Sequence, residues 1–333
     1  MTSATMELRE MVRFRPRRLA HGNFFVSDLE RSTSFYVDVC GLNLVYREPG
    51  IHANFLSNGS SHHDAALMEI SREARVGRGG HVQVPAGRGR TPGLNHVAFE
   101  MENEALLVAA YRRAVAAHVP IHRTADHQIS HSVYLFDPDG NYLEIYWDAT
   151  KDWRGVYKAN ENELLTATWD PNAAAPSDDR NYNPDPQYST VPAALLHPKR
   201  TSRAALLTPD VQRLQDFYVQ IVGLDVVAED PESRYVTLAG TVDGQDISLL
   251  VTHDGRKGLH HFSFELEEEA ELADAIGRLK AGRIPILAEI DNPTKHSVAI
   301  ADPDGIVLEF FVKRRVPLSA YAPAENEPIE FVV

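Results

Sequence analysis

The stretch HSVYLFDPDGNYLEIYW at residues 131–147 reappears as HSVAIADPDGIVLEFFV at residues 296–312, at an offset of 165 residues. At the same offset GLNHVAFE (93–100) matches GLHHFSFE (258–265). At an offset of 182, FYVDVCGLNLV (35–45) matches FYVQIVGLDVV (217–227). Self-similarity at such a spacing indicates a repeated structural unit, so the chain is a duplication of a unit of roughly 130 residues.

Each unit contains two halves of similar plan. In the first half, an apolar run at 22–26 predicts a strand, and Ser27-Asp28 precede a helix that Gly41 ends. Further strands are expected near Leu44 and over 65–70. The second half predicts a strand at 95–101, a helix at about 103–117, and strands at 132–136 and 141–147 joined by an Asp-Pro-Asp-Gly turn. Strand, helix and several strands, used four times, predict an α+β fold of four βαβββ modules, in which paired modules curl around a cavity.

Composition divides the chain into four segments. We expect one domain at 18–150, a connector at 151–199, a second domain at 200–313 and a tail at 314–333. The connector is rich in Pro, Asn and Asp, which predicts irregular backbone that packs on the surface or over a cavity mouth. Arginines gather around residues 72–90, where we expect solvated surface or loop.

Charge and cysteine content exclude several classes of protein. The 333 residues include 47 acidic and 33 basic side chains, a formal charge of −14, which argues against nucleic acid as a partner. The single cysteine, Cys40, excludes an intrachain disulfide framework and a thiolate metal cluster. The first 18 residues do not read as a secretory signal, and no apolar run is long enough for a membrane helix. We therefore expect a soluble, cytoplasmic protein with no nucleic-acid or membrane partner.

Three side chains in the first unit can form a metal site. His21 begins the first predicted strand, His96 lies on the first strand of the second half, and Glu144 lies on the last strand. Residues of one parity share one face of a strand, so all three can point inward. Two imidazoles and one carboxylate leave open coordination positions, as in non-haem Fe(II) oxygenases. A lone strand histidine is more often structural, but the combination favours a metal site.

The same segments resemble a known family. GLNHVAFE, followed about 50 residues later by YLFDPDGNYLEIYW, is similar to the metal-binding half of the vicinal oxygen chelate superfamily. Within it, the resemblance is to type I extradiol dioxygenases of the catechol 2,3-dioxygenase kind. It covers 18–148 well and 200–313 at the level of fold. It implies two glyoxalase/extradiol-dioxygenase-like domains, Fe(II) with Mn(II) as a possible substitute, O₂ as co-substrate, and a small aromatic diol as substrate.

The resemblance also implies roles around the metal. FLSNGSSHHDAAL (55–67) resembles the family stretch whose histidine acts as acid and base, which places that role on His63. HQISHSVYLF (127–136) resembles the family's paired histidines followed by a tyrosine, which places His127 and Tyr134 beside the substrate, with His131 as the competitor of His127. We expect His52, His62, His118 and His122 on the surface or in loops. The family's reaction inserts both oxygen atoms and opens the ring next to the diol.

The second unit serves as an internal control. At the offsets above, His21 corresponds to Arg203, His63 to Gln245, His96 to His261, His127 to Asn292, Tyr134 to Ala299 and Glu144 to Glu309. The second copy therefore keeps two of the three candidate ligands and loses the other candidate groups, while its FYV, DPDG and LEF segments persist. We expect 200–313 to be a degenerate structural partner, although the C-terminal domain is the active one in the usual extradiol pattern.

Three alternatives stay open from sequence. The first module could pair with the fourth, which would join His21 to His261 and Glu309. The protein could instead be a glyoxalase-like lyase or isomerase, although such enzymes generally want a carboxylate where this chain has His63. It could also be a metal-free binding module of the same superfamily. A homo-oligomer is expected because exposed apolar sheet edges commonly support assembly.

Overall fold

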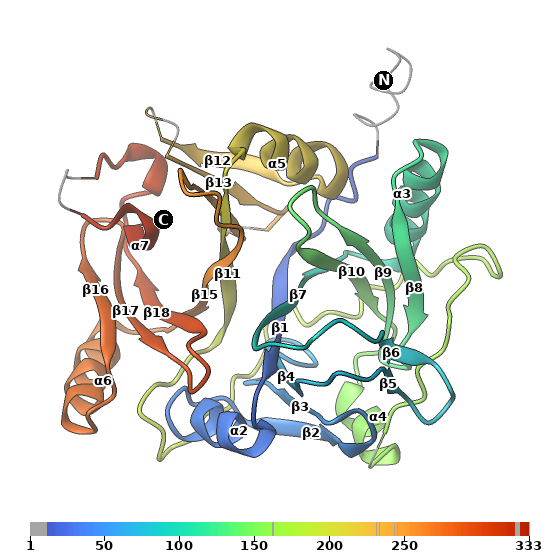
Figure 1. Ribbon diagram of the computed structural model, residues 1–333, viewed down its shortest axis with the longest axis horizontal. Coiled ribbons are helices and arrows are strands. Elements are labelled where there is room, and N and C mark those ends of the chain that lie inside the picture. Colours follow the sequence, from blue (N-terminus) through green and yellow to red (C-terminus); the bar gives the residue numbers. More distant parts are fainter. Residues whose placement is uncertain are drawn as a thin grey trace.

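The chain forms two similar sheets that lie side by side (Figure 1). The computed structural model describes residues 12–161, 163–230, 232, 234–242, 244, 246–323 and 327–332. Each sheet has eight strands, and the two strand orders are equivalent: β2-β3-β4-β1-β7-β10-β9-β8 and β12-β13-β14-β11-β15-β18-β17-β16. The duplication seen in the sequence is thus a duplication of the fold.

The first sheet holds two modules that meet where β1 pairs antiparallel with β7. The strands are β1 Arg18–Val26, β2 Leu44–Glu48, β3 Ala53–Leu56, β4 Ala65–Glu69, β7 Gly93–Glu100, β8 Ile121–Asp126, β9 Ser130–Phe136 and β10 Tyr142–Asp148. Helices α2 (Leu29–Asp38) and α3 (Glu104–Ala116) follow the first strand of each module, and α4 (Trp153–Ala159) belongs to the connector. A short hairpin, β5 Arg75–Val76 and β6 Val82–Val84, stands apart from the sheet.

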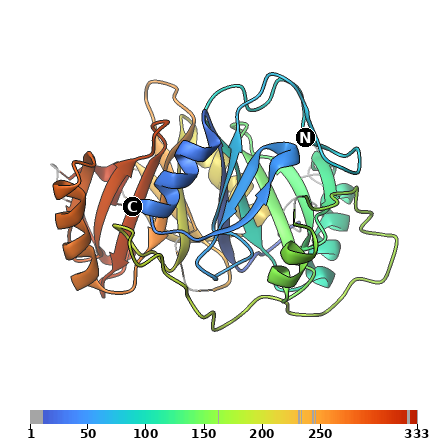
Figure 2. The same ribbon diagram turned by 90° about the horizontal axis from the view of Figure 1, so that it is seen from below.

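The second sheet repeats this plan. Its strands are β11 Arg200–Thr208, β12 Asp225–Glu229, β13 Tyr235–Ala239, β14 Ile247–Val251, β15 Gly258–Glu265, β16 Ile286–Asp291, β17 Lys295–Ala301 and β18 Val307–Lys313. The helices are α5 (Val211–Phe217), extended by a π-helical turn over Tyr218–Val222, α6 (Glu269–Ala281) and the terminal α7 (Ile329–Val332). Helices α3 and α6 lie at opposite ends of the molecule (Figure 2).

The predicted modules are confirmed, with differences in detail. Helix α2 begins after Asp28, whose side chain accepts a hydrogen bond from the Arg31 backbone N–H, as expected for an N-cap. The strands that were not located from the sequence are β3, β8 and the pair β5–β6. They are short or polar, so they carry little alternation of apolar and polar residues.

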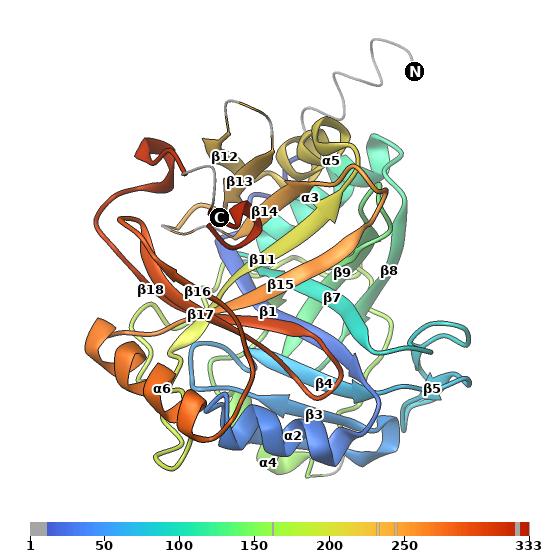
Figure 3. The same cartoon turned by 60° about the vertical axis from the view of Figure 1, so that its left-hand side comes forward.

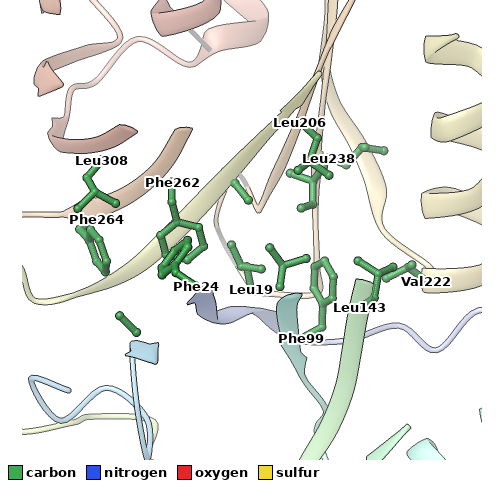
Figure 4. Close-up of a cluster of buried hydrophobic side chains, with 14 of the residues drawn as sticks. Leu19, Phe24, Phe99, Leu143, Leu206, Val222, Leu238, Phe262, Phe264 and Leu308 are labelled. Atoms are coloured by element: carbon green, nitrogen blue, oxygen red, sulfur yellow. The ribbon is translucent and has the colours of Figure 1, made fainter. Parts of the chain in front are cut away.

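An apolar core joins the two sheets (Figure 4). Phe24 of β1 and Phe262 of β15 meet edge to face, with ring centroids 5.3 Å apart. Strands β1 and β11 cross near the middle of the molecule (Figure 3). Both halves contribute buried residues to one core. Separating them would therefore expose apolar side chains of each half to water and destabilise both.

Polar contacts between the halves come in pairs that follow the internal repeat. The Tyr36 hydroxyl lies 3.4 Å from Asp302 Oδ2, and the Tyr218 hydroxyl lies 3.2 Å from Asp137 Oδ2. Each tyrosine belongs to an FYV segment and each aspartate to a DPDG turn of the other half. The two most persistent motifs of the repeat therefore hold the halves together, which explains why both copies keep them.

The connector packs against the first half at two places before the second half begins. Leu195 and Leu196 donate backbone hydrogen bonds to the Asp38 and Val39 carbonyl oxygens at the end of α2. Earlier in the connector, Tyr157 and Leu164 line a cavity of the first half, so this segment does lie over a cavity. Among the helices that the structure describes, none is long and apolar enough to cross a membrane.

The end of α2 provides a test of this packing. Gly41 has φ +74°, and a Cβ there would overlap the Leu196 carbonyl oxygen. Gly140 also has positive φ (+92°), but a Cβ there would meet nothing within 4 Å. Replacing Gly140 by alanine should cost about 1–2 kcal/mol of unfolding free energy, the backbone cost alone. Gly41→Ala should cost about 1–3 kcal/mol more because the connector must move. Denaturant unfolding of both variants measures this difference, and equal losses would contradict the proposed contact.

Candidate metal centre

Strand register brings three of the predicted site residues to one face of the first sheet. His21 of β1 lies opposite Ala98 of β7, and Glu144 of β10 lies beside the same Ala98. His96 is two residues before Ala98, so it shares that face. Ala98 carries only a methyl group, which leaves space between the three larger side chains.

The spacing of the polar atoms fits a divalent ion. His21 Nε2 and His96 Nε2 lie 3.3 and 3.1 Å from Glu144 Oε2, and one ligand atom from each residue lies within 4.8 Å of the others. Ligand atoms on adjacent octahedral positions about 2.1 Å from a metal are about 3.0 Å apart. Two imidazoles and a carboxylate are also a donor set that suits Fe(II). The three residues therefore fit the group that the sequence implies.

The electrostatics of the cluster favour metal binding. Burial lowers the pKa of His21 to about 4 despite the contact with Glu144, and burial likewise lowers the pKa of His96. Burial alone would raise the pKa of Glu144, but its hydrogen bonds with His21 and His96 outweigh burial and hold the pKa well below its ordinary value. Both imidazoles are therefore neutral and the carboxylate is ionised at neutral pH, the states in which these groups bind metals.

A serine that the sequence analysis missed orients the carboxylate. Ser132 of β9 lies opposite Tyr146 of β10, and its hydroxyl donates to Glu144 Oε1 at 2.6 Å. This leaves Oε2 facing the two imidazoles. Partners of this kind fix the direction in which a ligand presents its lone pair.

The equivalent position in the second half is filled by protein cations. Arg203 Nη2 lies 2.8 Å from Glu309 Oε2, and Lys295 Nζ lies 2.6 Å from Glu309 Oε1. His261 remains nearby, 3.5 Å from Glu309. Burial lowers the pKa of Lys295 to about 7, so Arg203 is the permanent cation beside Glu309, and its charge opposes the binding of a further cation. Gln245, the counterpart of His63, lies outside the described residues.

The alternative pairing of the first and fourth modules is wrong. His21 belongs to the same sheet as His96 and Glu144, whereas His261 and Glu309 belong to the second sheet. The first module pairs with the second because β1 and β7 are neighbours.

One cavity opens beside the three residues. His96 and Glu144 form part of its wall. Both modules of the first sheet contribute to it. Its apolar lining residues include Ile51, Phe55, Met68, Val84, Ile129 and Leu164.

His63 lines this cavity next to the cluster. Its ring centroid lies 3.8 Å from that of His21, and within the described part of the chain neither ring nitrogen has a hydrogen-bond partner. Burial lowers the pKa of His63 well below its ordinary value, and the neighbouring His21 and His62 lower it further. A neutral imidazole with unpartnered nitrogens is available to a ligand in the cavity.

His127 and Tyr134 also line the cavity, and they contact each other. His127 Nε2 lies 2.9 Å from the Tyr134 hydroxyl. Burial lowers the pKa of His127 to about 3 and raises the pKa of Tyr134 well above its ordinary value. His131 lies elsewhere: its Nδ1 is 2.6 Å from Glu104, and its ring stacks on Trp169. Of the two competing histidines, His127 is therefore the one that reaches the cavity.

The structure gives His62 a position that the sequence did not indicate. It lies in a loop, as expected, but it is only 2% exposed and lines the cavity beside His63. Its Nδ1 lies 2.7 Å from Asp148 Oδ1 at the end of β10. His62 and His63 lie in a loop, where side chains do not alternate between two faces as they do on a strand, so both can line the same cavity.

Comparison with known proteins agrees with this architecture. Paired βαβββ modules around a cavity with inward histidines and a glutamate define the vicinal oxygen chelate class. The family described as Glyoxalase/Bleomycin resistance protein/Dioxygenase superfamily matches residues 18–145 and 200–310, and the chain belongs to it.

Relatives narrow the comparison. Biphenyl-2,3-diol 1,2-dioxygenase 3 of Rhodococcus globerulus is 29% identical over 60% of this chain and 95% of its own length. Catechol-2,3-dioxygenase of Bacillus subtilis is 22% identical over 88% of this chain and 97% of its own. Among solved structures, the Mn(II)-bound glyoxalase from Novosphingobium aromaticivorans has a TM-score of 0.63 at 16% identity, covering 93% of this chain and 89% of its own.

Proposed function

We propose that the chain is an Fe(II)-dependent extradiol dioxygenase that cleaves the ring of an aromatic diol, with its metal site in the first half. The observation that carries the proposal is the convergence of His21, His96 and Glu144, beside a cavity whose wall includes His96 and Glu144. The names of the two curated relatives, both dioxygenases of aromatic diols, support it.

The arrangement assigns a task to each group. Held by the three ligands, Fe(II) would supply adjacent positions for diol and O₂ and favour ionisation of the diol. His63, neutral and without a partner, can accept the proton that a diol hydroxyl loses and return it later in the reaction. Tyr134, whose hydroxyl contacts His127, can donate a hydrogen bond to an oxygen atom of the diol. The apolar lining holds the ring and excludes water.

A glyoxalase-like lyase is the second candidate, because the Mn(II)-bound glyoxalase from Novosphingobium aromaticivorans has a similar fold. Such enzymes generally use a further carboxylate as a metal ligand at the position where this chain has His63. Among the described residues, Glu144 is the only carboxylate in the candidate metal clusters. This chemistry favours the oxygenase.

Oxygen uptake tests the proposal. The protein is purified without air, given Fe(II), and mixed with catechol, 2,3-dihydroxybiphenyl or a side-chain-substituted catechol. Admission of air should then consume one O₂ per diol and yield a yellow semialdehyde product. Stoichiometric iron with no O₂ uptake from any diol would favour the lyase. Failure to bind any divalent metal would favour a metal-free binding protein.

A further inference from the structure

Two arginines stand in the wall of the cavity, on segments where the sequence analysis placed no site residue. Arg88 follows the β5–β6 hairpin, in the stretch expected to be solvated, and Arg123 lies on β8. The Arg88 guanidinium carbon lies 3.9 Å from the Tyr142 ring centroid, and that of Arg123 lies 4.5 Å from the Tyr134 ring centroid. The two tyrosine rings stack on each other and both meet the His96 ring edge to face.

Neither arginine forms an ion pair with a described residue. Arg88 donates to the Asn95 carbonyl oxygen at 2.5 Å, and Arg123 donates to the Val82 carbonyl oxygen at 3.0 Å. The Arg123 Nε atom is buried without a hydrogen-bond partner in the described part of the chain. Backbone carbonyls satisfy some of the N–H groups but do not neutralise the charge.

The carboxylates in the cavity wall do not balance these two charges. Among described residues, only Glu48 and Glu144 supply carboxylates to the lining. Glu144 is engaged with His21 and His96. Burial raises the pKa of Glu48 to about 8, aided by the charge of Glu163, so that at neutral pH Glu48 is mostly uncharged.

Bound metal and diol do not balance them either. A divalent ion with Glu144 has a net charge of +1, which a singly deprotonated diol neutralises. The two guanidinium charges then remain. Burial lowers the pKa of Arg88 to about 10, and the nearby charge of Arg123 contributes to this; Arg88 is nevertheless still cationic at neutral pH. Two like charges in one partly buried cavity are costly unless an anion accompanies them.

We propose that Arg88 and Arg123 bind an anionic substituent of the substrate, so that the preferred diol carries a carboxylate on a side chain of its ring. This inference rests on the proposed function and narrows its substrate class. A guanidinium offers a planar pair of N–H donors that matches a carboxylate. Stacking on Tyr142 and Tyr134 restricts how the guanidiniums can turn, which prepares them for such a partner.

A matched pair of ligands tests the inference. The pair is 3-(3,4-dihydroxyphenyl)propanoate and its amide, which differ in charge but keep the same diol, because the two side-chain carbons insulate the ring. Affinity of the iron-loaded chain is measured by calorimetry without air, and kcat and KM are measured with air. The wild-type chain should favour the acid by roughly tenfold to hundredfold, mainly in affinity and KM.

Variants assign the preference to the two side chains. Arg88→Met and Arg123→Met should each lower the ratio of acid affinity to amide affinity by roughly tenfold or more, because only the acid loses a charged partner. Arg88→Lys should restore part of the preference. The control is Arg90→Met, since Arg90 is exposed on the same loop and does not line the cavity. It should keep the full preference. Thermal unfolding of each variant checks that the fold is retained.

Contrary outcomes are distinct. Equal affinity of the wild-type chain for acid and amide overturns the inference, as does an equal weakening of both ligands by Arg88→Met, which would mean that the arginine serves the diol or the fold. If both diols are cleaved with the same KM, the proposed function stands and the inference fails. If the acid binds more tightly but neither diol consumes O₂, the carboxylate site stands and the proposed function fails.

Discussion

Replacing His21 by alanine is expected to abolish metal retention and ring cleavage together. His21 supplies one of the three ligands of the proposed site, and its removal leaves only His96 and Glu144 of that group. Loss of an outer hydrogen-bonding partner already weakens metal sites by roughly 10- to 100-fold, so loss of a ligand should weaken this one more. Metal content after desalting and O₂ uptake with a diol measure the two effects.

The matched control for this experiment is His261→Ala. His261 is as buried as His21 and also lies beside a glutamate, Glu309, at 3.5 Å. Glu309 is already paired with Arg203 and contacts Lys295. The control should therefore keep one metal per chain and full activity, at some cost in stability from the cavity it leaves. Iron lost from His261→Ala but retained by His21→Ala would place the metal in the second half and end the proposal.

The duplication explains why the fold could be predicted. The FYV and DPDG segments recur because each copy uses them at the contact with the other half, where Tyr36 meets Asp302 and Tyr218 meets Asp137. The strands that carry the candidate ligands are long and largely apolar, so they stand out in the sequence. The order of strands in a βαβββ module predicts which of these strands are neighbours. Alternation of side chains along each strand then predicts that His21, His96 and Glu144 share one face.

The remainder of the cavity wall could not be predicted for physical reasons. Arg123 lies on β8, IHRTAD, whose polar composition resembles a loop. Arg88 lies in a loop that long-range contacts bring over the cavity, and nothing in its local sequence indicates that position. Asn23, two residues after His21, was within reach of the alternation argument and does line the cavity. The sequence pattern therefore predicts the site residues on regular apolar strands. The positions of residues on polar strands and loops depend on tertiary packing, which the pattern does not show.

The two copies differ by charge as well as by ligand count. Where the first half holds His21 beside Glu144, the second holds Arg203 beside Glu309. An arginine cannot release its proton in a protein. In the second half it therefore acts as a permanent cation where the first half would hold a metal ion. In the second half, Arg203 pairs with the buried carboxylate of Glu309. This pairing agrees with the expectation that the second half is a structural partner of the first.

His63→Phe is expected to leave the metal in place and slow turnover by roughly 10²- to 10⁴-fold, the usual contribution of a positioned acid or base. Phenylalanine keeps the ring in contact with His21 and Phe55. It removes no hydrogen bond to a described residue, because neither nitrogen of His63 has such a partner. The variant should therefore fold normally and bind iron and diol.

The pH dependence of the His63→Phe variant separates a proton-transfer role from a structural one. Without a base in the cavity, the reaction must wait for diol that has already ionised, so the residual rate should rise with pH up to the pKa of the bound diol. In the wild-type chain, His63 is neutral and able to accept the proton at neutral pH, so the rate should depend less on pH in that range. A variant whose rate falls by the same factor at every pH would show that His63 shapes the cavity but moves no proton. Loss of iron from this variant would instead place His63 among the ligands, with His21 and His62 as its neighbours.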